Sequence, residues 1–155
     1  MPLAYMEHFL LQTEDIEATK DWYVKVLGFR VGSAPDFKFP VYWLYLGDRD
    51  VLHITTGGAN VSENRKKYVG QESQVTSGSG VIDHVAFRAT GLAEMIDHLK
   101  NNKIEFKERQ VNDQGLYQLF LHDPNGVKVE LNFDNAEVKG RKPQLMASEL
   151  TSAPN

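Results

Sequence analysis

The feature that most constrains the fold is an internal repeat. Two segments with alternating apolar residues, "MEHFLLQ" (6–12) and "VIDHVAFRA" (81–89), each carry one histidine. These histidines, His8 and His84, lie 76 residues apart. Alternation of apolar and polar side chains is typical of half-buried strands. The repeat therefore predicts two copies of one module, each opening on a strand that carries a histidine.

A second pair of segments supports the same repeat. "VLHITT" (51–56) and "VKVELNF" (127–133) close the two halves, and they place His53 and Glu130 at matching points 77 residues apart. The two halves thus superpose with one residue of slippage. A polar group falls at each of four equivalent places in the duplicated unit.

Each half is expected to run strand, helix and then three strands, a βαβββ module. Asp15 is the expected N-cap of the first helix, and Gly28 the glycine after its C-terminus. Thr90 is the expected N-cap of the second helix, and "DPNG" (123–126) is strong turn chemistry. The expected strands are 6–12, 29–32, 41–46 and 51–56 in the first half, and 81–89, 105–110, 116–122 and 127–133 in the second.

We expect an α+β fold in which two βαβββ modules form an open, cup-shaped mixed sheet around a metal site. The first module spans 1–58 and the second 81–134. Residues 59–80, rich in Gly, Ser and polar side chains, are expected to form a linker loop. Residues 135–155 have little periodicity and are expected to form a C-terminal tail.

Composition excludes several classes of function. The net charge is −4 and the one dense basic cluster, "RKK" (65–67), is expected to be a solvated loop, so nucleic acid is not an expected partner. The chain has no cysteine, which excludes disulfides and thiolate chemistry. No apolar run approaches the roughly 20 residues of a membrane span, and the N-terminus does not resemble a signal peptide. A cytoplasmic protein that acts on a small molecule is expected.

The four polar residues at equivalent places suggest a metal site. Residues i and i+2 of a strand share a face, so Glu130 lies opposite the apolar residues of its strand, on a face that must meet something polar. Imidazole and carboxylate together suit Zn, Fe, Mn, Co or Ni. Each residue alone has an ordinary structural explanation. His8, His53, His84 and Glu130 taken together are better explained as a divalent-metal site.

The sequence resembles the vicinal oxygen chelate superfamily, which includes glyoxalase I, extradiol dioxygenases, fosfomycin thiol transferases and bleomycin-binding proteins. The resemblance covers residues 5–134 and rests on the paired modules and on "DWYVKVLGF", "DHVAFR" and "FLHDPNGVKVEL". It implies that His8, His84 and Glu130 are metal ligands. It further implies that His53 is either a fourth ligand or an acid/base beside the metal.

The resemblance leaves the reaction open. Two histidines and one carboxylate on Fe(II) are the extradiol dioxygenase set, which we favour, and His53 would then move protons. Phe120 departs from that class, because its active-site tyrosine would fall there; Tyr45 is the residue that could compensate. A glyoxalase I-like isomerase or lyase using Zn²⁺, Ni²⁺, Mn²⁺ or Co²⁺ is the alternative, with Glu130 as base, although that class has a glutamate where this chain has His53.

Two further alternatives remain. Fosfomycin transferases share the His, His and Glu set, but the basic residues for a phosphonate are not identified. A non-catalytic protein that sequesters a small ligand in the same cup is the other, and the metal set counts against it.

Strand parity also predicts the walls of the substrate site. Trp43 and Tyr45 are expected on the cleft side, and Gln118 and Phe120 mirror them in the second half. For Trp43, core packing is the ordinary alternative. Arg88 either anchors a substrate anion or forms a salt bridge at its strand end. By resemblance, chains of this length form homodimers in which one module of each chain completes a cup.

Overall fold

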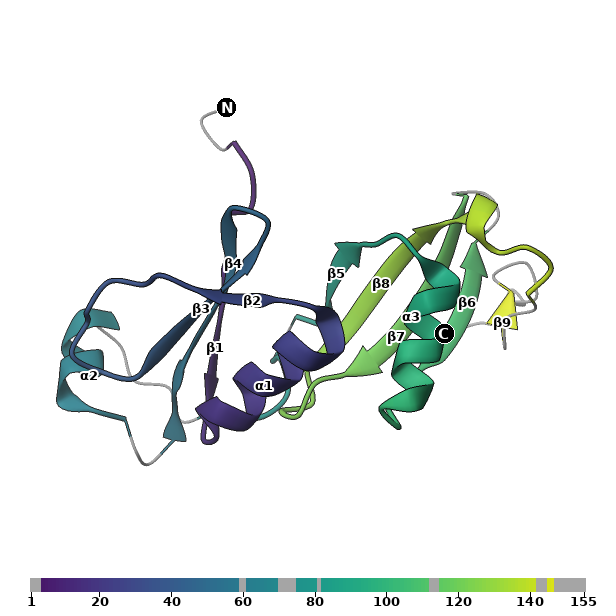
Figure 1. Cartoon of the computed structure of the whole chain (residues 1–155). Coiled ribbons are helices and arrows are strands. Elements are labelled where there is room, and N and C mark those ends of the chain that lie inside the picture. Colours follow the sequence, from purple (N-terminus) through teal and green to yellow (C-terminus); the bar gives the residue numbers. More distant parts are fainter. Residues whose placement is uncertain are drawn as a thin grey trace. The chain divides into compact units, whose positions relative to one another are not determined.

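The computed structural model describes residues 4–58, 61–69, 75–80, 82–111, 115–141 and 145–146. The chain divides into two compact units, Met1–Gly78 and Ser79–Asn155, which we call module one and module two (Figure 1). Each unit builds its own mixed sheet from a βαβββ core, which confirms the predicted α+β fold class.

Module one contains a four-stranded sheet of order β1-β4-β3-β2 (Figure 1). β1 pairs with β4 in parallel, and the other pairs are antiparallel. A parallel pair needs a crossover connection, and α1 with β2 and β3 supplies it. The elements are β1 (Phe9–Thr13), α1 (Ile16–Leu27), β2 (Arg30–Gly32), β3 (Val41–Leu46), β4 (Arg49–Thr56) and, beyond the sheet, α2 (Glu63–Val69).

Both predicted ends of α1 are confirmed. The Asp15 carboxylate accepts a hydrogen bond from the Ala18 backbone N–H at 2.9 Å, which satisfies one of the free donors at the helix start. Gly28 ends the helix in the left-handed conformation at φ 75°, where a side chain would be strained. Tyr23 and Val26 are buried on the inner face of the helix, and they hold it on the core face of the sheet.

Module two contains a sheet of order β5-β8-β7-β6-β9 (Figure 1). β5 and β8 are parallel, as β1 and β4 are in module one, and β9 adds a parallel strand beside β6 that was not predicted. The elements are β5 (His84–Arg88), α3 (Leu92–Asn101), β6 (Lys107–Val111), β7 (Leu116–His122), β8 (Lys128–Asp134), the 3₁₀ turn η3 (Asn135–Glu137) and β9 (Leu145–Met146).

The N-terminus of α3 differs from the prediction. Gly91, not Thr90, is the N-cap, and as a glycine it has no side chain to cap the helix. The Glu137 carboxylate instead accepts the backbone N–H groups of Gly91 and Leu92 at 2.9 and 3.0 Å. A carboxylate 45 residues away along the chain thus caps the helix and complements its dipole. Local sequence alone does not reveal that partner.

The cores lie between each helix and one face of its sheet. In module one the large buried side chains are Tyr23, Phe29, Leu44, Leu52 and Ile54. In module two they are Leu92, Ile96, Leu99, Tyr117, Leu119, Leu121, Val129, Leu131 and Phe133. Alternation then leaves the opposite sheet faces to the predicted site residues.

The segment between the modules also departs from expectation. Residues 59–80, expected as a linker loop, include α2, and the cluster "RKK" lies on that helix. Arg65 is only 2% exposed, so the expectation of a solvated loop is wrong for this residue. Its guanidinium donates to the Gln12 side-chain oxygen at 3.0 Å, and this bond joins α2 to β1.

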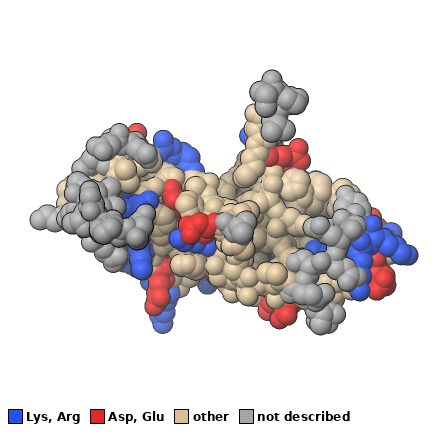
Figure 2. Space-filling model, turned by 180° about the vertical axis from the view of Figure 1, so that it is seen from behind, with Lys and Arg blue, Asp and Glu red and all other residues tan. Residues whose placement is uncertain are grey.

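The surface agrees with the scattered charge of the sequence. On the face shown in Figure 2, described acidic and basic side chains occur in small separate groups, with no single large patch of either sign. Among the described helices, none combines the length and the hydropathy needed to cross a bilayer.

Candidate functional site

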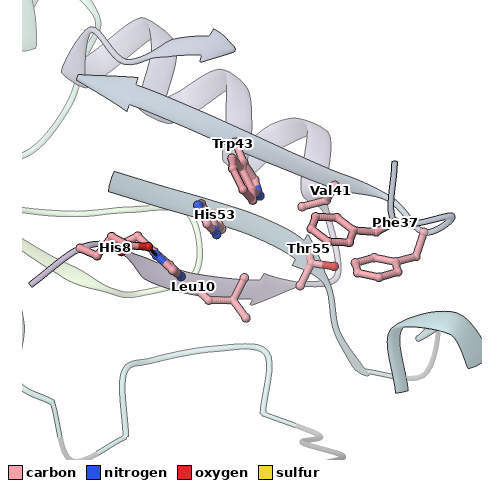
Figure 3. Close-up of a pocket in the computed structure, with 9 residues that line it drawn as sticks. His8, Leu10, Phe37, Val41, Trp43, His53 and Thr55 are labelled. Carbon is pink, nitrogen blue, oxygen red and sulfur yellow. Dashed lines mark hydrogen bonds and ion pairs between the residues drawn. The ribbon is translucent and has the colours of Figure 1, made fainter. Parts of the chain in front are cut away.

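Two histidines and a tryptophan form an aromatic stack in module one. His8 lies one residue before β1, and His53 lies on β4, where it pairs in register with Trp43 of β3. The His8 and His53 rings are 3.8 Å apart at 19°, and the His53 and Trp43 rings are 4.1 Å apart at 3°. Figure 3 shows His53 lying between the other two rings. The structure therefore brings together both predicted site residues of this module.

A carboxylate that was not predicted orients His53. Asp50 Oδ2 lies 2.7 Å from His53 Nε2. The imidazole is 8% exposed, and this burial lowers its pKa, against the opposing effect of the hydrogen bond with Asp50. The same hydrogen bond lowers the pKa of Asp50. Asp50 is three residues from His53, a spacing that places residues on opposite faces of a regular strand, so parity gives no hint of the contact.

The stack forms one end of a pocket of about 290 Å³ in module one. Phe37 and Phe39 stack on each other at 5.3 Å, and Phe37 lies 6.2 Å from the Trp43 ring (Figure 3). These two phenylalanines were not predicted, although their alternation in "DFKF" is visible. The pocket is lined by Glu7, His8, Leu10, Phe37, Phe39, Val41, Trp43, His53 and Thr55.

Tyr45 does not line this pocket, contrary to its predicted place in the wall. Its hydroxyl donates to the Ser33 carbonyl at 2.6 Å, and the Arg30 guanidinium lies 4.9 Å from the centre of its ring. These contacts occupy Tyr45 at the edge of the sheet, beside β2. Trp43, by contrast, lies where the parity argument placed it.

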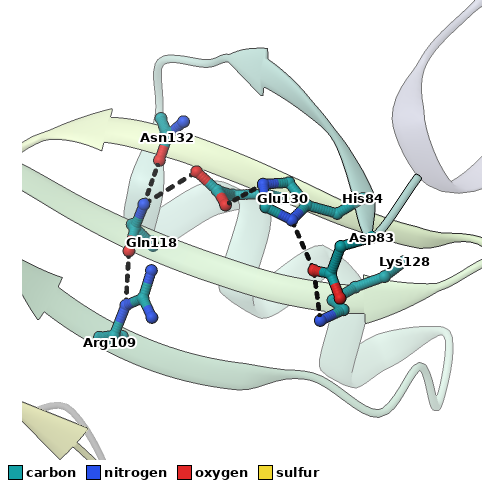
Figure 4. A network of polar contacts seen from close by, with 7 residues as sticks. All are labelled: Asp83, His84, Arg109, Gln118, Lys128, Glu130 and Asn132. Atoms are coloured by element: carbon teal, nitrogen blue, oxygen red, sulfur yellow. Dashed lines mark hydrogen bonds and ion pairs between the residues drawn. The ribbon is translucent and has the colours of Figure 1, made fainter. Parts of the chain in front are cut away.

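In module two a row of polar side chains crosses the sheet. His84 Nε2 and Glu130 Oε2 are 3.0 Å apart. The Gln118 amide donates to Glu130 Oε1 at 2.8 Å and to Asn132 Oδ1 at 2.9 Å. Arg109 Nε in turn donates to Gln118 Oε1 at 2.7 Å. Figure 4 shows this row, in which the position of Arg109 was not predicted.

Two side chains at the centre of this row are buried. Glu130 is 7% exposed and Gln118 is 4% exposed. A buried carboxylate is costly unless it is hydrogen-bonded or paired. Here the Gln118 amide satisfies one oxygen and leaves the other facing His84. The hydrogen bond thus fixes the carboxylate so that its second oxygen and the Nε2 of His84 face each other.

An acidic residue directly precedes each first-strand histidine. Glu7 Oε1 lies 3.1 Å from His8 Nδ1, and Asp83 Oδ2 lies 2.8 Å from His84 Nδ1. Lys128 also contacts Asp83 at 2.8 Å, and the two partners lower the Asp83 pKa to about 2 (Figure 4). An imidazole that donates from Nδ1 to a carboxylate keeps its Nε2 lone pair for a metal. The dipeptides "EH" and "DH" were the overlooked sequence signal.

These contacts test whether the residues fit a metal. Within module two, the facing Nε2 and carboxylate oxygen fit a divalent cation, as does the free Nε2 of His8 in module one. His53 fits less well as a ligand, because its Nε2 is engaged by Asp50, which is not one of the predicted ligands, whereas the Nε2 of His84 faces the predicted ligand Glu130. Among the residues that the structure describes, no group of three or more His, Asp or Glu side chains is arranged to hold a metal ion. Each module thus offers part of a ligand set.

The remaining predicted residues lie on the site face of module two. Phe120 pairs in register with Glu130, and the Arg109 guanidinium lies 4.8 Å from the centre of its ring. Arg88 is exposed at the end of β5, in register with Asn132. It forms no ion pair with any described side chain, so of the two predicted roles the strand-end salt bridge is not seen there.

Comparison with solved structures identifies the class of fold. A lactoylglutathione lyase from Agrobacterium tumefaciens superposes with a TM-score of 0.61 at 18% identity, over 88% of this chain and 98% of that one. The fosfomycin resistance protein FosX from Listeria monocytogenes gives 0.60 at 13% identity, over 84% and 93%. TnmS3, an antibiotic binding protein from Streptomyces sp. CB03234, gives 0.61 at 16%, over 86% and 98%. At these identities the likeness establishes a paired-module fold.

The family follows from the sequence profile. The profile of the Glyoxalase/Bleomycin resistance protein/Dioxygenase superfamily matches residues 5–131, a range that includes His8, His53, His84 and Glu130. The chain belongs to this superfamily, which confirms the predicted resemblance. Its structural relatives include both enzymes and a binding protein.

Proposed function

We propose that the protein is a ferrous-iron-dependent dioxygenase of the extradiol type that opens a catechol-like ring. In this proposal His8, His84 and Glu130 hold the metal, and His53 is the acid/base. The observation that carries the proposal is the hydrogen bond of 2.7 Å between His53 and Asp50. It engages the Nε2 of His53 and leaves two histidines and one carboxylate, the ligand set of non-haem Fe(II) oxygenases.

The pocket of module one supports a flat aromatic substrate. Trp43, Phe37 and Phe39 supply ring faces, and aromatic pairs add about 0.5–1.5 kcal/mol beyond simple burial. Bound iron would supply the chemistry that activates dioxygen. Ring opening breaks the bond between one hydroxyl-bearing carbon and the neighbouring ring carbon that bears no hydroxyl. Both atoms of dioxygen enter the product. His53, oriented by Asp50, accepts a proton from a substrate hydroxyl.

The experiment is anaerobic loading with Fe(II), followed by air and a panel of catechols, with ring-opened product followed by absorbance. We expect turnover that is lost in His84→Ala and kept in His98→Ala, a histidine on α3 away from the row. Zn²⁺- or Ni²⁺-dependent turnover of a hemithioacetal without ring cleavage would establish the glyoxalase-like alternative. A wild-type chain that holds no divalent metal and binds catechol unchanged in His84→Ala would establish the non-catalytic binding alternative.

Asp50→Asn tests the role of His53 separately from metal binding. If His53 is the acid/base and Asp50 positions it, this substitution lowers kcat by about 10²- to 10⁴-fold, the usual contribution of general acid–base catalysis. Metal content and KM should stay unchanged. If metal content falls instead, His53 is a ligand and the proposed division of roles is wrong.

We also propose that a homodimer completes the metal site. Met6 (76% exposed), Leu10 (47%) and Ile82 (59%), which flank the two first-strand histidines, are large apolar side chains on the surface. Such side chains suit faces that another module covers. Mixing His8→Ala with His84→Ala protein tests this. A site shared between chains regains activity, because one of the two sites in each mixed dimer has all its ligands, whereas a site within one chain stays inactive.

A further inference from the structure

The site face of module two carries more positive charge than a metal site needs. The strand registers align Arg88, Asn132, Gln118 and Arg109 in one row across β5, β8, β7 and β6. The next row along the strands contains Ala86, Glu130, Phe120 and Lys107. Glu130 is the one carboxylate in these two rows, against three Lys or Arg side chains.

Arg109 is the best-ordered of these cations. Its Nε donates to the Gln118 side-chain oxygen, and its guanidinium carbon lies 4.8 Å from the centre of the Phe120 ring. The Gln118 amide is fixed in turn by Glu130 and Asn132. Arg109 is therefore held from two sides by neutral groups, and Figure 4 shows it at the end of the row opposite His84.

The charge of Arg109 is not balanced by any described residue. No carboxylate of the described residues lies within 4.0 Å of its nitrogens, whereas Arg141 in the same module is paired with Glu108. A guanidinium has five N–H donors in a planar fork, and Gln118 uses one of them. Lys128 is matched by Asp83, but Arg88 and Lys107 have no described acidic partner either.

A cavity lies beside this cation. It has a volume of about 1120 Å³, and its lining includes Lys107, Arg109, Phe120, His122 and Lys128. Two carboxylates also line it, Glu105 and Glu108, and Glu108 is paired with Arg141. Arg109 lies two strands away from the strand of Glu130, which corresponds to about 10 Å. A small ring that bears an acidic group can span much of that distance, and the arginine side chain covers the rest.

We propose that Arg109, oriented by Gln118 and Phe120, binds an oxyanion of the substrate. A planar carboxylate suits the guanidinium fork best, because two parallel N–H···O bonds form at once. The inference deepens the proposed function: the substrate is a catechol-like ring that carries an acid. Binding of the acid itself needs no metal.

The test is direct binding to metal-free, full-length protein, measured by calorimetry at low salt. The probes are benzoate, its neutral match benzamide, and phenylphosphonate. We expect benzoate to bind and benzamide to bind at least about tenfold more weakly. Arg109→Gln should weaken benzoate by about 10- to 100-fold, as expected for a charge-assisted bidentate pair, and leave benzamide unchanged.

The matched control is Arg30→Gln. Arg30 also lies over an aromatic ring, 4.9 Å from the centre of Tyr45, but in module one and away from its pocket. It should leave all three probes unaffected. Arg109→Lys should retain part of the binding, which separates charge from fork geometry and guards against loss of folding in Arg109→Gln.

The outcomes decide both the site and its ligand. Tighter binding of phenylphosphonate than benzoate, still dependent on Arg109, assigns the site to a phosphonate or phosphate instead of a carboxylate. Equal binding of benzoate and benzamide, or an equal loss of both in Arg109→Gln, overturns the site, as does the absence of anion binding. Absence of ring cleavage with Arg109-dependent benzoate binding intact would contradict the proposed function alone.

Discussion

The two modules share one backbone plan but carry opposite chemistry on their site faces. In module one the face around the histidines is mainly aromatic, with Trp43, Phe37 and Phe39 in or beside its pocket, and its charged groups are the carboxylates of Glu7 and Asp50. In module two the corresponding face is a polar row that ends in a cation, from His84 through Glu130 and Gln118 to Arg109. The parallel pairs β1–β4 and β5–β8 nevertheless place the predicted ligands at equivalent points.

This difference indicates a division of labour. Stacking holds His53 in module one, and hydrogen bonds hold Glu130 in module two. Under the proposed function, the ring faces of module one would contact the apolar part of the ligand. Arg109 of module two, which has no acidic partner among the described residues, would contact its charged part. Substitutions on the site face of each module test this difference.

The largest effect is expected from Glu130→Gln. The amide keeps the shape of the side chain but removes the negative charge that faces His84. The affinity for a divalent metal should fall by more than the roughly 10- to 100-fold that loss of an outer hydrogen-bond partner costs. Metal titration followed by elemental analysis measures this, with His98→Ala as the control that stays at wild-type affinity. Unchanged affinity would remove Glu130 from the metal site.

Gln118→Leu should have the next largest effect. The substitution leaves the buried Glu130 carboxylate without its amide donor and Arg109 without its acceptor. Metal affinity should fall by about 10- to 100-fold, and benzoate affinity should fall with it. The same calorimetric titrations report both. A loss of one without the other would show that the two ends of the row act independently.

Trp43→Leu tests module one in the same way. Removing the indole face should weaken catechol and carboxylated catechol alike by a few-fold to about tenfold, the range of one aromatic pair. Arg109→Gln should instead discriminate between the two ligands. Trp22→Leu, on α1, is the control. If Trp43→Leu affects only the acid, the division of labour is wrong.

Phe120→Tyr should have a smaller effect. Phe120 lies in register with Glu130, at the place where the extradiol class has a tyrosine. A hydroxyl there adds one hydrogen-bond donor near the metal ligand, and kcat with catechols should rise by a few-fold, within the energy of one hydrogen bond. Steady-state kinetics on the Fe(II) enzyme measure it. A fall in kcat would show that a hydroxyl is not tolerated beside Glu130.

The smallest effect is expected from Arg65→Met. Arg65 is buried with its Nε unpaired, and burial lowers its pKa. Replacing a poorly compensated buried charge with an apolar side chain of similar length is often neutral or stabilising. Urea denaturation should show a change in the free energy of unfolding within about 1 kcal/mol. A large loss would mean that Arg65 has a role beyond its bond to Gln12.

Much of this fold could be predicted because short-range patterns of apolar and polar residues specify its strands and helices. The strands at 41–46 and 116–122 were predicted with the bounds that the structure has, since alternation there is regular. His8 and His84 were expected inside strands, yet His8 lies just before β1 and His84 begins β5. Ends of strands depend on pairing partners, and pairing partners are distant in sequence.

The parts that could not be predicted depend on contacts across the sheet. Strand parity placed Gln118 on the cleft side, but Arg109 is an ordinary polar residue in the sequence, and only the register brings it beside Gln118. Asp50 contacts His53 although strand parity places the two residues on opposite faces, and Glu137 caps α3 from 46 residues beyond Gly91 in the sequence. The strand β9 lies in a segment with little periodicity, and residues 147–155 of the predicted tail lie outside the described part of the chain.

The ring stack of module one has a practical consequence for spectroscopy. The chain has two tryptophans, Trp22 and Trp43, and the indole of Trp43 lies parallel to the imidazole of His53 at 4.1 Å. Trp22→Phe therefore leaves Trp43 as the single tryptophan, in direct contact with the proposed acid/base. Its emission should respond whenever an aromatic ligand enters the pocket or the neighbouring imidazole changes its hydrogen bonding. The protein thus contains a built-in optical reporter of its own pocket.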